Sequence, residues 1–503
     1  MKINPSIGNI LPFQPELRPV LPTIEGNVDY QEFRRQMERM DEMLVQGGVE
    51  CKAVELRLKR WMKERKGSVR ANSVRIFQLH TMKALRCNHA RTLLGEDFRG
   101  MSCRMADSAL LQRFCLIERL DRIRVPSKST LQRYGEWFSV EEMREINGYL
   151  LGAVCQEVRE GRQALDLEEP LGIEEYFLDT SCVKANIHFP VDWVLLRDAT
   201  RTLMKAVMVI RKHGLKHRMG APQEFLKRMN GLSIQMTHTR RKAESRKERK
   251  RVLRLMKRQV NVVAAHALRH RQLLDEKWHE SDLTRKQAEQ ILGRMDGVLQ
   301  LLPAARKQAH ERIIGERVVE NADKILSLYE REIRVIVRGK AGADVEFGNT
   351  LVLGEQKDGV IVDWKLMEEQ APADSRLVIE SIQRVEHTLG RKIGAATTDR
   401  GFESSNNVRW LKQRKIYNGI CPKDPKELKS RLRSKKFCQL QKRRAQTEAR
   451  VAIFKNQFLG KPMRSKGFGH REIQISWGVL AHNLWVIARL PRAAEEEFVK
   501  KAA

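Results

Sequence analysis

The feature that most constrains the fold of this sequence is the spacing of its strand-like segments. The run Glu175–Ser181 is short, apolar up to Asp179 and typical of a buried strand. Residues 193–333 then favour helix and are very basic, and strand character returns only from Arg334. This separation of the first strand from the others predicts an α/β sheet domain that a long helical insertion interrupts once.

Strands and helices alternate after the insertion. Lys357, Asp358 and Gly359 form a turn signal between the strand-like residues 345–353 and 360–364, which predicts a hairpin. The elements expected after it are a helix at 374–387, a strand at 392–398, a helix at 405–413, a strand at 416–420, a helix around Glu448 and a last helix at 473–490. This order predicts a mixed sheet with flanking helices.

Residues 28–170 favour helix, because they contain few β-branched runs and little glycine. One helix ends at Phe114, and another begins after Pro126 with Ser129 or Thr130 as its N-cap. The pair is compatible with a helix-turn-helix that contacts DNA at the second start, through Lys128, Gln132 and Arg133. An ordinary helical bundle with a polar surface explains the pattern equally well.

The chain is strongly basic, with 95 Lys and Arg against 63 Asp and Glu and a net charge of +32. This indicates a polyanion partner, most simply nucleic acid, although a ribosome-associated or merely basic protein would share the charge. The charge is densest at 240–258, where 11 of 19 residues are Lys or Arg. Like charges weaken an isolated helix, so DNA would stabilise this segment; a solvated helical arm is the alternative. The expected DNA contacts here are Arg240, Arg241, Arg249 and Lys250.

Eight cysteines without a CxxC pair or zinc-ligand spacing favour reduced thiols in a cytoplasmic protein. The Pro-rich N-terminus has no apolar core of a signal peptide, and no apolar run approaches the roughly 20 residues of a membrane helix. We therefore expect no signal peptide and no membrane partner.

Three carboxylates carry the expected chemistry. Asp179 and Asp399 each end a predicted strand, and such strand ends gather sites in open α/β sheets. On a helix, Glu448 shares one face with Arg444 and Lys455, which lie four residues before and seven after it. Hard oxygen ligands suit Mg²⁺ or Mn²⁺, and two such ions can cleave a phosphodiester while flanking cations hold phosphates.

Each carboxylate also has a plainer interpretation. Asp399 before Arg-Gly is an ordinary turn residue, Asp179 can cap a turn, and Glu448 can be a solvated ion-pair partner of Arg444. The three together are far less expected by accident. Weaker candidates for the site are Asp192, Asp363, Asn186 and His188.

These residues resemble motifs of the DDE transposases of bacterial insertion sequences. The segment 179–192 is similar to that around the family's first aspartate, and Thr398–Phe402 to that around the second. Arg444-x₃-Glu448-x₆-Lys455 resembles the Tyr-Arg-Glu-Lys signature, with Gln441 in place of the tyrosine. The resemblance spans about 175–490 and is weaker over 70–135.

The resemblance implies an RNase H-like catalytic core and an active DNA transposase. Asp179, Asp399 and Glu448 would bind two metal ions, and the enzyme would bind terminal inverted repeats, cut DNA and transfer the strand. The implied partners are element and target DNA, a homodimer is the default, and the protein would join the bacterial nucleoid when bound. The alternatives are a DNA-binding protein without catalysis and an RNase H-like nuclease that cuts without joining.

The expected organisation follows from both arguments. It comprises an extended arm (1–27), a helical DNA-binding region (28–170), a catalytic domain (171–192 and 334–490), a basic helical insertion (193–333) and a tail (491–503).

Overall fold

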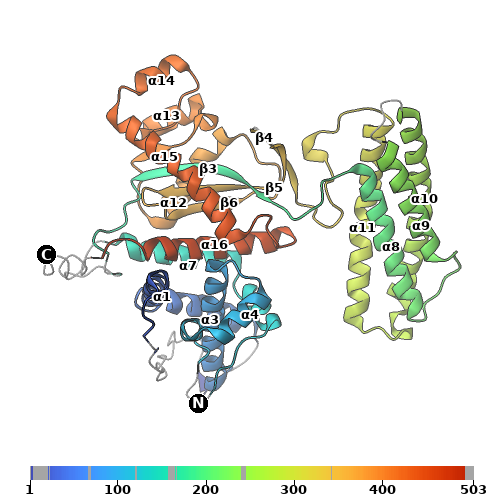
Figure 1. Ribbon diagram of the computed structural model, residues 1–503, viewed down its shortest axis with the longest axis horizontal. Coiled ribbons are helices and arrows are strands. Elements are labelled where there is room, and N and C mark those ends of the chain that lie inside the picture. Colours follow the sequence, from blue (N-terminus) through green and yellow to red (C-terminus); the bar gives the residue numbers. More distant parts are fainter. Residues whose placement is uncertain are drawn as a thin grey trace.

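The computed structural model describes residues 2–3, 21, 23–65, 69–118, 122–156, 165, 167–239, 245–340 and 343–492. The chain forms a body that contains the sheet and, beside it, a bundle of helices (Figure 1). The bundle is formed by the residues between β3 (Glu175–Lys184) and β4 (Arg334–Lys340). The mixed α/β class that the sequence predicted is confirmed.

In the described part of the chain, six strands form one mixed sheet with β3 inside it. The long strand β5 (Ala343–Gln356) pairs antiparallel with one edge of β3, and β7 (Ala395–Thr397) pairs parallel with the other. Next to β7 lies β8 (Tyr417–Asn418), also parallel. On its far edge β5 pairs antiparallel with β4 and with β6 (Ile361–Leu366).

Most of the elements expected after the insertion are present. The hairpin β5–β6 turns at residues 357–359, where Gly359 has a positive φ of 91°. The expected strands at 392–398 and 416–420 are shorter, as β7 and β8. The helices that follow the sheet's strands are α12 (Leu377–Leu389), α13 (Ser405–Gln413), α14 (Pro425–Arg431), α15 (Lys435–Ile453) and α16 (Phe468–Ile487).

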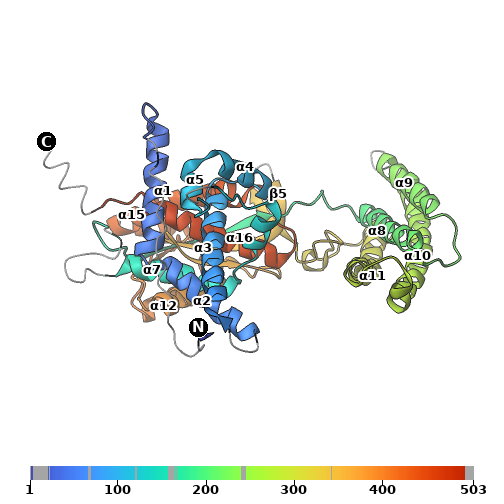
Figure 2. The ribbon, with the colours of Figure 1, turned by 90° about the horizontal axis from the view of Figure 1, so that it is seen from below.

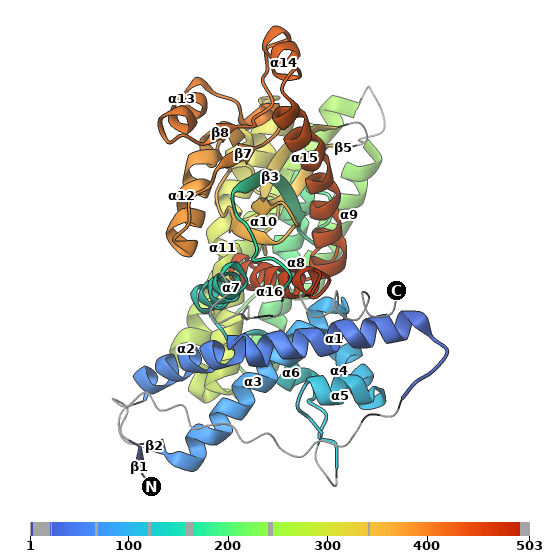
Figure 3. The ribbon, with the colours of Figure 1, turned by 90° about the vertical axis from the view of Figure 1, so that its left-hand side faces the viewer.

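Helices cover the sheet on both sides, with α12 and α13 on one side and α15 on the other (Figure 3). Successive side chains of a strand point to opposite faces. On β3, Tyr176 hydrogen-bonds Ser381 of α12 with an O–O distance of 2.6 Å. The next residue, Phe177, lies under the guanidinium of Arg443 on α15. The odd-numbered residues of β3 therefore face α15.

The N-terminal residues form helices that pack beneath the sheet against α16 (Figure 3). Their buried side chains join those of the sheet in one continuous core. The helices are α1 (Val28–Gln46), α2 (Val49–Glu64), α3 (Ala71–Leu93), α4 (Phe98–Asp107), α5 (Ala109–Phe114), α6 (Lys128–Gly135) and α7 (Val140–Cys155), and β1 (Lys2–Ile3) pairs with β2 (Val69–Arg70). Most of the expected arm at 1–27, and the tail beyond residue 492, lie outside the described residues.

The start of α6 differs in detail from the prediction. Ser127, rather than Ser129 or Thr130, is its N-cap, and its hydroxyl accepts a hydrogen bond from the backbone N–H of Thr130. Residues 115–127 separate α5 from α6, far more than the roughly three or four residues of a helix-turn-helix turn. Of the two interpretations of these helices, the compact helix-turn-helix is therefore wrong, and the spacing agrees with the helical bundle.

The insertion is a bundle with a core of its own. Its long helices are α8 (Asp192–Lys212), α9 (Pro222–Thr239), α10 (Arg246–Lys277) and α11 (Arg285–Ile313), and short helical turns follow at η2 (Trp278–Glu280) and η3 (Asn321–Asp323). Figures 1 and 2 show α8 and α11 on the side of the bundle nearest the sheet. A capping box between Thr284 and Gln287 starts α11. The basic segment 245–258 forms the first half of α10, as its helical pattern predicted.

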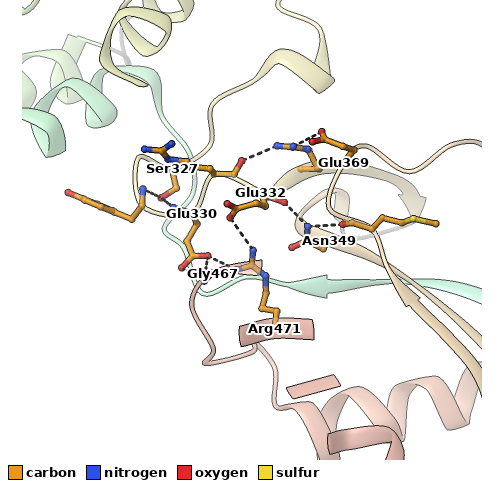
Figure 4. A network of polar contacts seen from close by, with 11 residues as sticks. Ser327, Glu330, Glu332, Asn349, Glu369, Gly467 and Arg471 are labelled. Carbon is orange, nitrogen blue, oxygen red and sulfur yellow. Dashed lines mark hydrogen bonds and ion pairs between the residues drawn. The ribbon is translucent and has the colours of Figure 1, made fainter. Parts of the chain in front are cut away.

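A polar network fixes the end of the insertion to the sheet body (Figure 4). Arg471 of α16 is fully buried and ion-pairs with Glu330, whose carboxylate also accepts the backbone N–H of Gly467 at 2.9 Å. Asn349 of β5 donates to the carbonyl of Glu332 at 2.6 Å. The neighbouring Arg331 donates to the α11 carbonyl of Gly297 at 2.9 Å. Residues 330–332, which lead from the bundle to the sheet, are thus bonded both to α11 of the bundle and to β5 and α16 of the sheet body.

All eight cysteines are free thiols, in agreement with their spacing in the sequence. Among the helices of the described ranges, none combines the length and the apolar character needed to cross a bilayer.

Candidate active site

Asp179 lies in the middle of β3, not at its end as the sequence pattern suggested. The strand continues to Lys184 because the following residues keep pairing with β5, where Leu353 lies opposite Asp179. Phe177 and Ser181 share the face of Asp179, and both contact α15 or the turn after it. Asp179 therefore points toward the helix that carries Glu448.

Asp399 reaches the same level of the sheet from the neighbouring parallel strand. Phe177 is paired with Thr397 of β7, and two residues further along each chain stand Asp179 and Asp399. Asp399 is the N-cap of the short turn η5 (Arg400–Phe402), and its Oδ1 accepts the N–H of Gly401 at 2.9 Å. Asp399 thus follows a strand end, as expected.

A buried carboxylate on β5 sets the rotation of α15. Glu355 lies opposite Phe177, and its Oε1 accepts hydrogen bonds from Thr447 Oγ1 at 2.7 Å and Arg443 Nη2 at 2.9 Å. These two residues lie one turn apart on α15. With that side of the helix bound to the sheet, the adjacent side presents Glu448, whose side chain is 62% exposed.

Arg444 and Gln441 form the rest of this helix face. Arg444 Nη1 lies 3.4 Å from Glu448 Oε1, and its Nε donates to Gln441 Oε1 at 3.2 Å. The amide of Gln441 donates in turn to the carbonyls of Thr398 and Gly419, at 3.2 and 2.6 Å. Gln441 therefore binds α15 to the loops after β7 and β8, and its amide is directed at protein rather than at a phosphate.

Lys455 lies beyond the regular helix. α15 ends at Ile453 and continues as a π-helical turn, η6 (Phe454–Leu459), so Lys455 does not share a regular α-helical face with Glu448 as the spacing predicted. Its Nζ nevertheless returns to the site, 2.9 Å from Ser181 Oγ on β3. The structure thus brings Lys455 beside Asp179 by a different route from the one predicted.

The three carboxylates interact electrostatically. Burial, together with the charges of Asp399 and Glu448, raises the pKa of Asp179 to about 6, although the Thr180 N–H and Arg444 oppose the shift. A cation near the three groups would relieve this repulsion. Within the described ranges, no three His, Cys, Asp or Glu side chains are close enough together to hold a metal ion. Glu448 is paired with Arg444 instead.

A fourth acid, Asp374, was missed by the sequence analysis. It begins the short turn η4 (Asp374–Arg376), and its Oδ1 accepts the hydroxyl of Thr180 at 3.2 Å. Gly401 lies between Asp374 and Asp399. A Cβ atom built on Gly401 would be 3.5 Å from Asp374 Oδ2 and 3.1 Å from Asp399 Oδ1. Asp374 therefore adjoins Asp399 and bonds the residue after Asp179 on the other face of β3, but nothing in its local sequence distinguishes it from other loop acids.

The remaining expected DNA contacts lie away from the carboxylates. Lys128 and Arg133 are exposed on α6, and Arg249 and Lys250 lie in the first turns of α10, where Lys250 pairs with Glu316 at 2.9 Å. Arg240 and Arg241 lie outside the described residues.

The weaker candidates have other places. Asp192 starts α8 and is buried against Arg312, and Asp363 of β6 is buried against Arg384 of α12. His188 and Asn186 are exposed in the connection from β3 to α8. Burial and ion pairing thus account for the two acids, and His188 lines a pocket that does not include the three carboxylates.

Comparison with known proteins identifies one family. Residues 355–484, about a quarter of the chain, match the family described as "Transposase DDE domain". The matched range runs from Glu355 through Asp399 and Glu448 into α16, and Asp179 precedes it. No curated protein and no solved structure matches the chain.

Proposed function

We propose that this chain is a DDE transposase of the insertion-sequence type, which binds the terminal inverted repeats of a mobile DNA element and cuts and joins DNA there; the match of residues 355–484 to the transposase DDE domain supports this. The observation that carries this proposal is the electrostatic coupling of Asp179 to Asp399 and Glu448 on one face of the sheet. DNA is the partner that such a family implies.

We further propose that the sheet body is an RNase H-like core formed by residues 171–192 and 334–490. The order β6, β5, β3, β7, β8, with β3 parallel to β7 and antiparallel to β5, supports this assignment. The helices on both faces support it as well. In this assignment residues 193–333 are an insertion after the first core strand, and 28–170 form the helical region that binds element ends.

Asp179, Asp399 and Glu448 are too far apart in this structure to share an ion, so Glu448 would have to leave Arg444 and approach the two aspartates. The three carboxylates would then hold two divalent ions, Mg²⁺ or Mn²⁺, whose chemistry is to activate the attacking oxygen and to stabilise the leaving one. The oxygen donors fit hard cations, and the mutual repulsion that raises the pKa of Asp179 is what a cation would offset. The backbones of two of these donors are fixed. Asp179 lies in the centre of β3, and Glu355 anchors α15, which carries Glu448.

Arg444 and Lys455 would bind the phosphates beside the cut. Arg444 is held by Gln441 and Lys455 reaches Ser181, so both cations are directed at the edge of the carboxylate cluster. A guanidinium and an ammonium at this place orient the scissile phosphate and balance its charge. Pairing of two DNA ends makes a homodimer on DNA the expected assembly.

The test is Glu448→Gln, assayed for Mg²⁺-dependent nicking of supercoiled DNA that carries the element ends. We expect nicking to be abolished and binding to the ends to stay within a few fold. Glu427→Gln is the matched control, because Glu427 forms the same exposed i,i+4 pair with an arginine on α14. Nicking at the wild-type rate by Glu448→Gln would refute the assignment of this residue.

Two further results would replace the proposal. A wild-type protein that binds DNA but never nicks it is a DNA-binding relative without catalysis. A protein that nicks but does not join pre-cut ends to a target is a nuclease, and a strand-transfer assay decides this point.

A further inference from the structure

A large basic groove lies where the insertion bundle meets the sheet body. Its volume is about 860 Å³. It is lined by α8, by α11, by the β3–α8 and η6–α16 connections and by the neighbouring residues Leu283 and Tyr329. The basic side chains of its lining are Arg197, Arg201, Lys205, Arg294 and Lys466, and two histidines, His188 and His213, also line it. The groove is distinct from the site of Asp179, Asp399 and Glu448, none of which lines it.

The two connecting segments lead from the carboxylate site to the groove side by side. At the site, Lys455 donates to Ser181. Further along, the N–H of Met463 donates to the carbonyl of Lys184 at 3.1 Å. At the groove, Lys466 and His188 both belong to the lining. The β3–α8 connection and the η6–α16 connection thus form one continuous surface.

The groove carries a net positive charge that acids compensate little. Asp198 is the acid among its lining residues, and it pairs with Arg197 at 3.0 Å. Among the residues that the structure describes, no carboxylate forms an ion pair with Arg201, Lys205 or Arg294. By contrast, Arg246 and Lys250 at the start of α10 share the carboxylate of Glu316.

We propose that this groove binds the phosphate backbone of double-stranded DNA that continues from the catalytic site, an inference that rests on the proposed function. Arg201 and Lys205 lie one turn apart on α8 and are both exposed, so they can contact phosphates of the same strand. The side-chain amides of Gln287 and Gln290 add hydrogen-bond donors that phosphate oxygens accept.

The distances fit a single duplex. β3 rises by about 3.3 Å per residue, so its end at Lys184 lies about 17 Å from Asp179. With about 3.4 Å per base pair, the groove begins roughly five to ten base pairs from the cut. The clamp of Glu330 on Arg471, together with the bond of Arg331 to α11, holds the bundle at this place.

The experiment measures binding of a fluorescent duplex of about 40 base pairs and arbitrary sequence over a series of salt concentrations. The groove variant is Arg201→Ala/Lys205→Ala, and the matched control is Lys227→Ala/Arg228→Ala on α9, where both side chains are exposed and do not line the groove. Each lost phosphate contact lowers the slope of log K against log salt by about 0.9. In the groove variant we expect the slope to fall by about 1.8 and binding at about 0.1 M salt to weaken on the order of ten-fold. In the control we expect the slope to fall by less than about 0.5.

An unchanged slope in the groove variant overturns the proposal, and so does an equal loss in the control, which would mean that any removed charge has this effect. Tighter binding of double-stranded RNA than of DNA to the wild-type groove would also overturn it. Failure of the proposed function is recognised separately. If the wild-type protein never nicks DNA but the groove variant alone loses slope, the groove remains a DNA site and the catalytic proposal falls.

Discussion

Thr447 of α15 donates a 2.7 Å hydrogen bond to Glu355 of β5, and the two residues are both buried although they stand far apart in the sequence. Arg443 completes the contact with an ion pair to the same carboxylate at 2.9 Å. This contact decides which side of α15 faces the sheet. Glu355 therefore orients Glu448 and Arg444 toward Asp179, although it contacts none of these three residues.

Glu355→Gln should reduce DNA cleavage and stability while leaving DNA binding intact. The glutamine can keep the bond to Thr447, but it leaves the partly buried Arg443 without the charge of its partner, which costs about 2 kcal/mol of unfolding free energy. Urea unfolding and single-turnover cleavage would measure the two effects. As a control, Glu380→Gln removes an exposed carboxylate 3.9 Å from Arg384 and should cost less than about 1 kcal/mol. Equal effects of both changes would show that Glu355 does not position α15.

Asp374→Asn should slow cleavage and raise the concentration of Mg²⁺ that it requires. Asp374 bonds Thr180 and adjoins Asp399 across Gly401, so its charge contributes to the attraction of cations at the site. Residues that support metal ligands in this way change affinity or activity by about 10- to 100-fold, and we expect the lower end. Cleavage over a Mg²⁺ titration measures the change.

Asp424→Asn is the control for Asp374, because it removes an exposed aspartate that caps α14 away from the carboxylates. An Mg²⁺ requirement of Asp374→Asn equal to that of the control would exclude a contribution of Asp374 to the site.

The parts that the sequence could predict are those set by local pattern. Ser405–Gln413 is helical as expected, because Ser404 caps it and its apolar residues recur at helical spacing. The hairpin follows from its turn residues in the same way. The end of β3 was misjudged because Thr180 and Ser181 look like a turn, whereas their backbone pairing with β5 depends on a strand that lies far along the chain.

The site could be predicted only in its residue types. Gln441 stands where the resembled signature has a tyrosine, and its amide is used by the carbonyls of Thr398 and Gly419, which belong to other loops. Lys455 was placed by regular helix geometry, and the π-helical turn changes that geometry. Asp374 carries no motif at all. In each case the deciding contact is between segments that the sequence does not show to be neighbours.

Asp179→Asn should stabilise the protein in the absence of divalent ions, and increasingly so as the pH rises. Burial and the two neighbouring carboxylates raise the folded-state pKa of Asp179 from 3.8 to about 6. The folded state therefore binds a proton more readily than the unfolded state, and stability is lost as the pH rises through this range. Relative to the variant, the wild type should lose about 2 kcal/mol between about pH 4.5 and about pH 7.5.

Urea unfolding of both proteins at the two pH values measures this difference, and groups other than Asp179 cancel in the comparison. Mg²⁺ or Mn²⁺ should then raise the melting temperature of the wild type more than that of Asp179→Asn, because a ligand of the folded state stabilises it by mass action. A constant difference in stability at the two pH values would show that Asp179 is not protonated in the folded protein near pH 6.

Glu330→Gln should weaken the attachment of the insertion bundle to the sheet body. Arg471 is fully buried, and this change leaves it with Glu332, 4.0 Å away, as its remaining carboxylate (Figure 4). Loss of the charge of one partner from a buried pair costs about 3 kcal/mol. The control is Glu369→Gln in the same network, where the carboxylate is 83% exposed and its pair with Arg334 contributes less than about 1 kcal/mol. Urea unfolding measures the loss of stability in both variants. We also expect Glu330→Gln to lower the slope of log K against log salt for DNA binding, because the groove is then no longer held in line with the carboxylate site. Glu369→Gln should leave this slope unchanged.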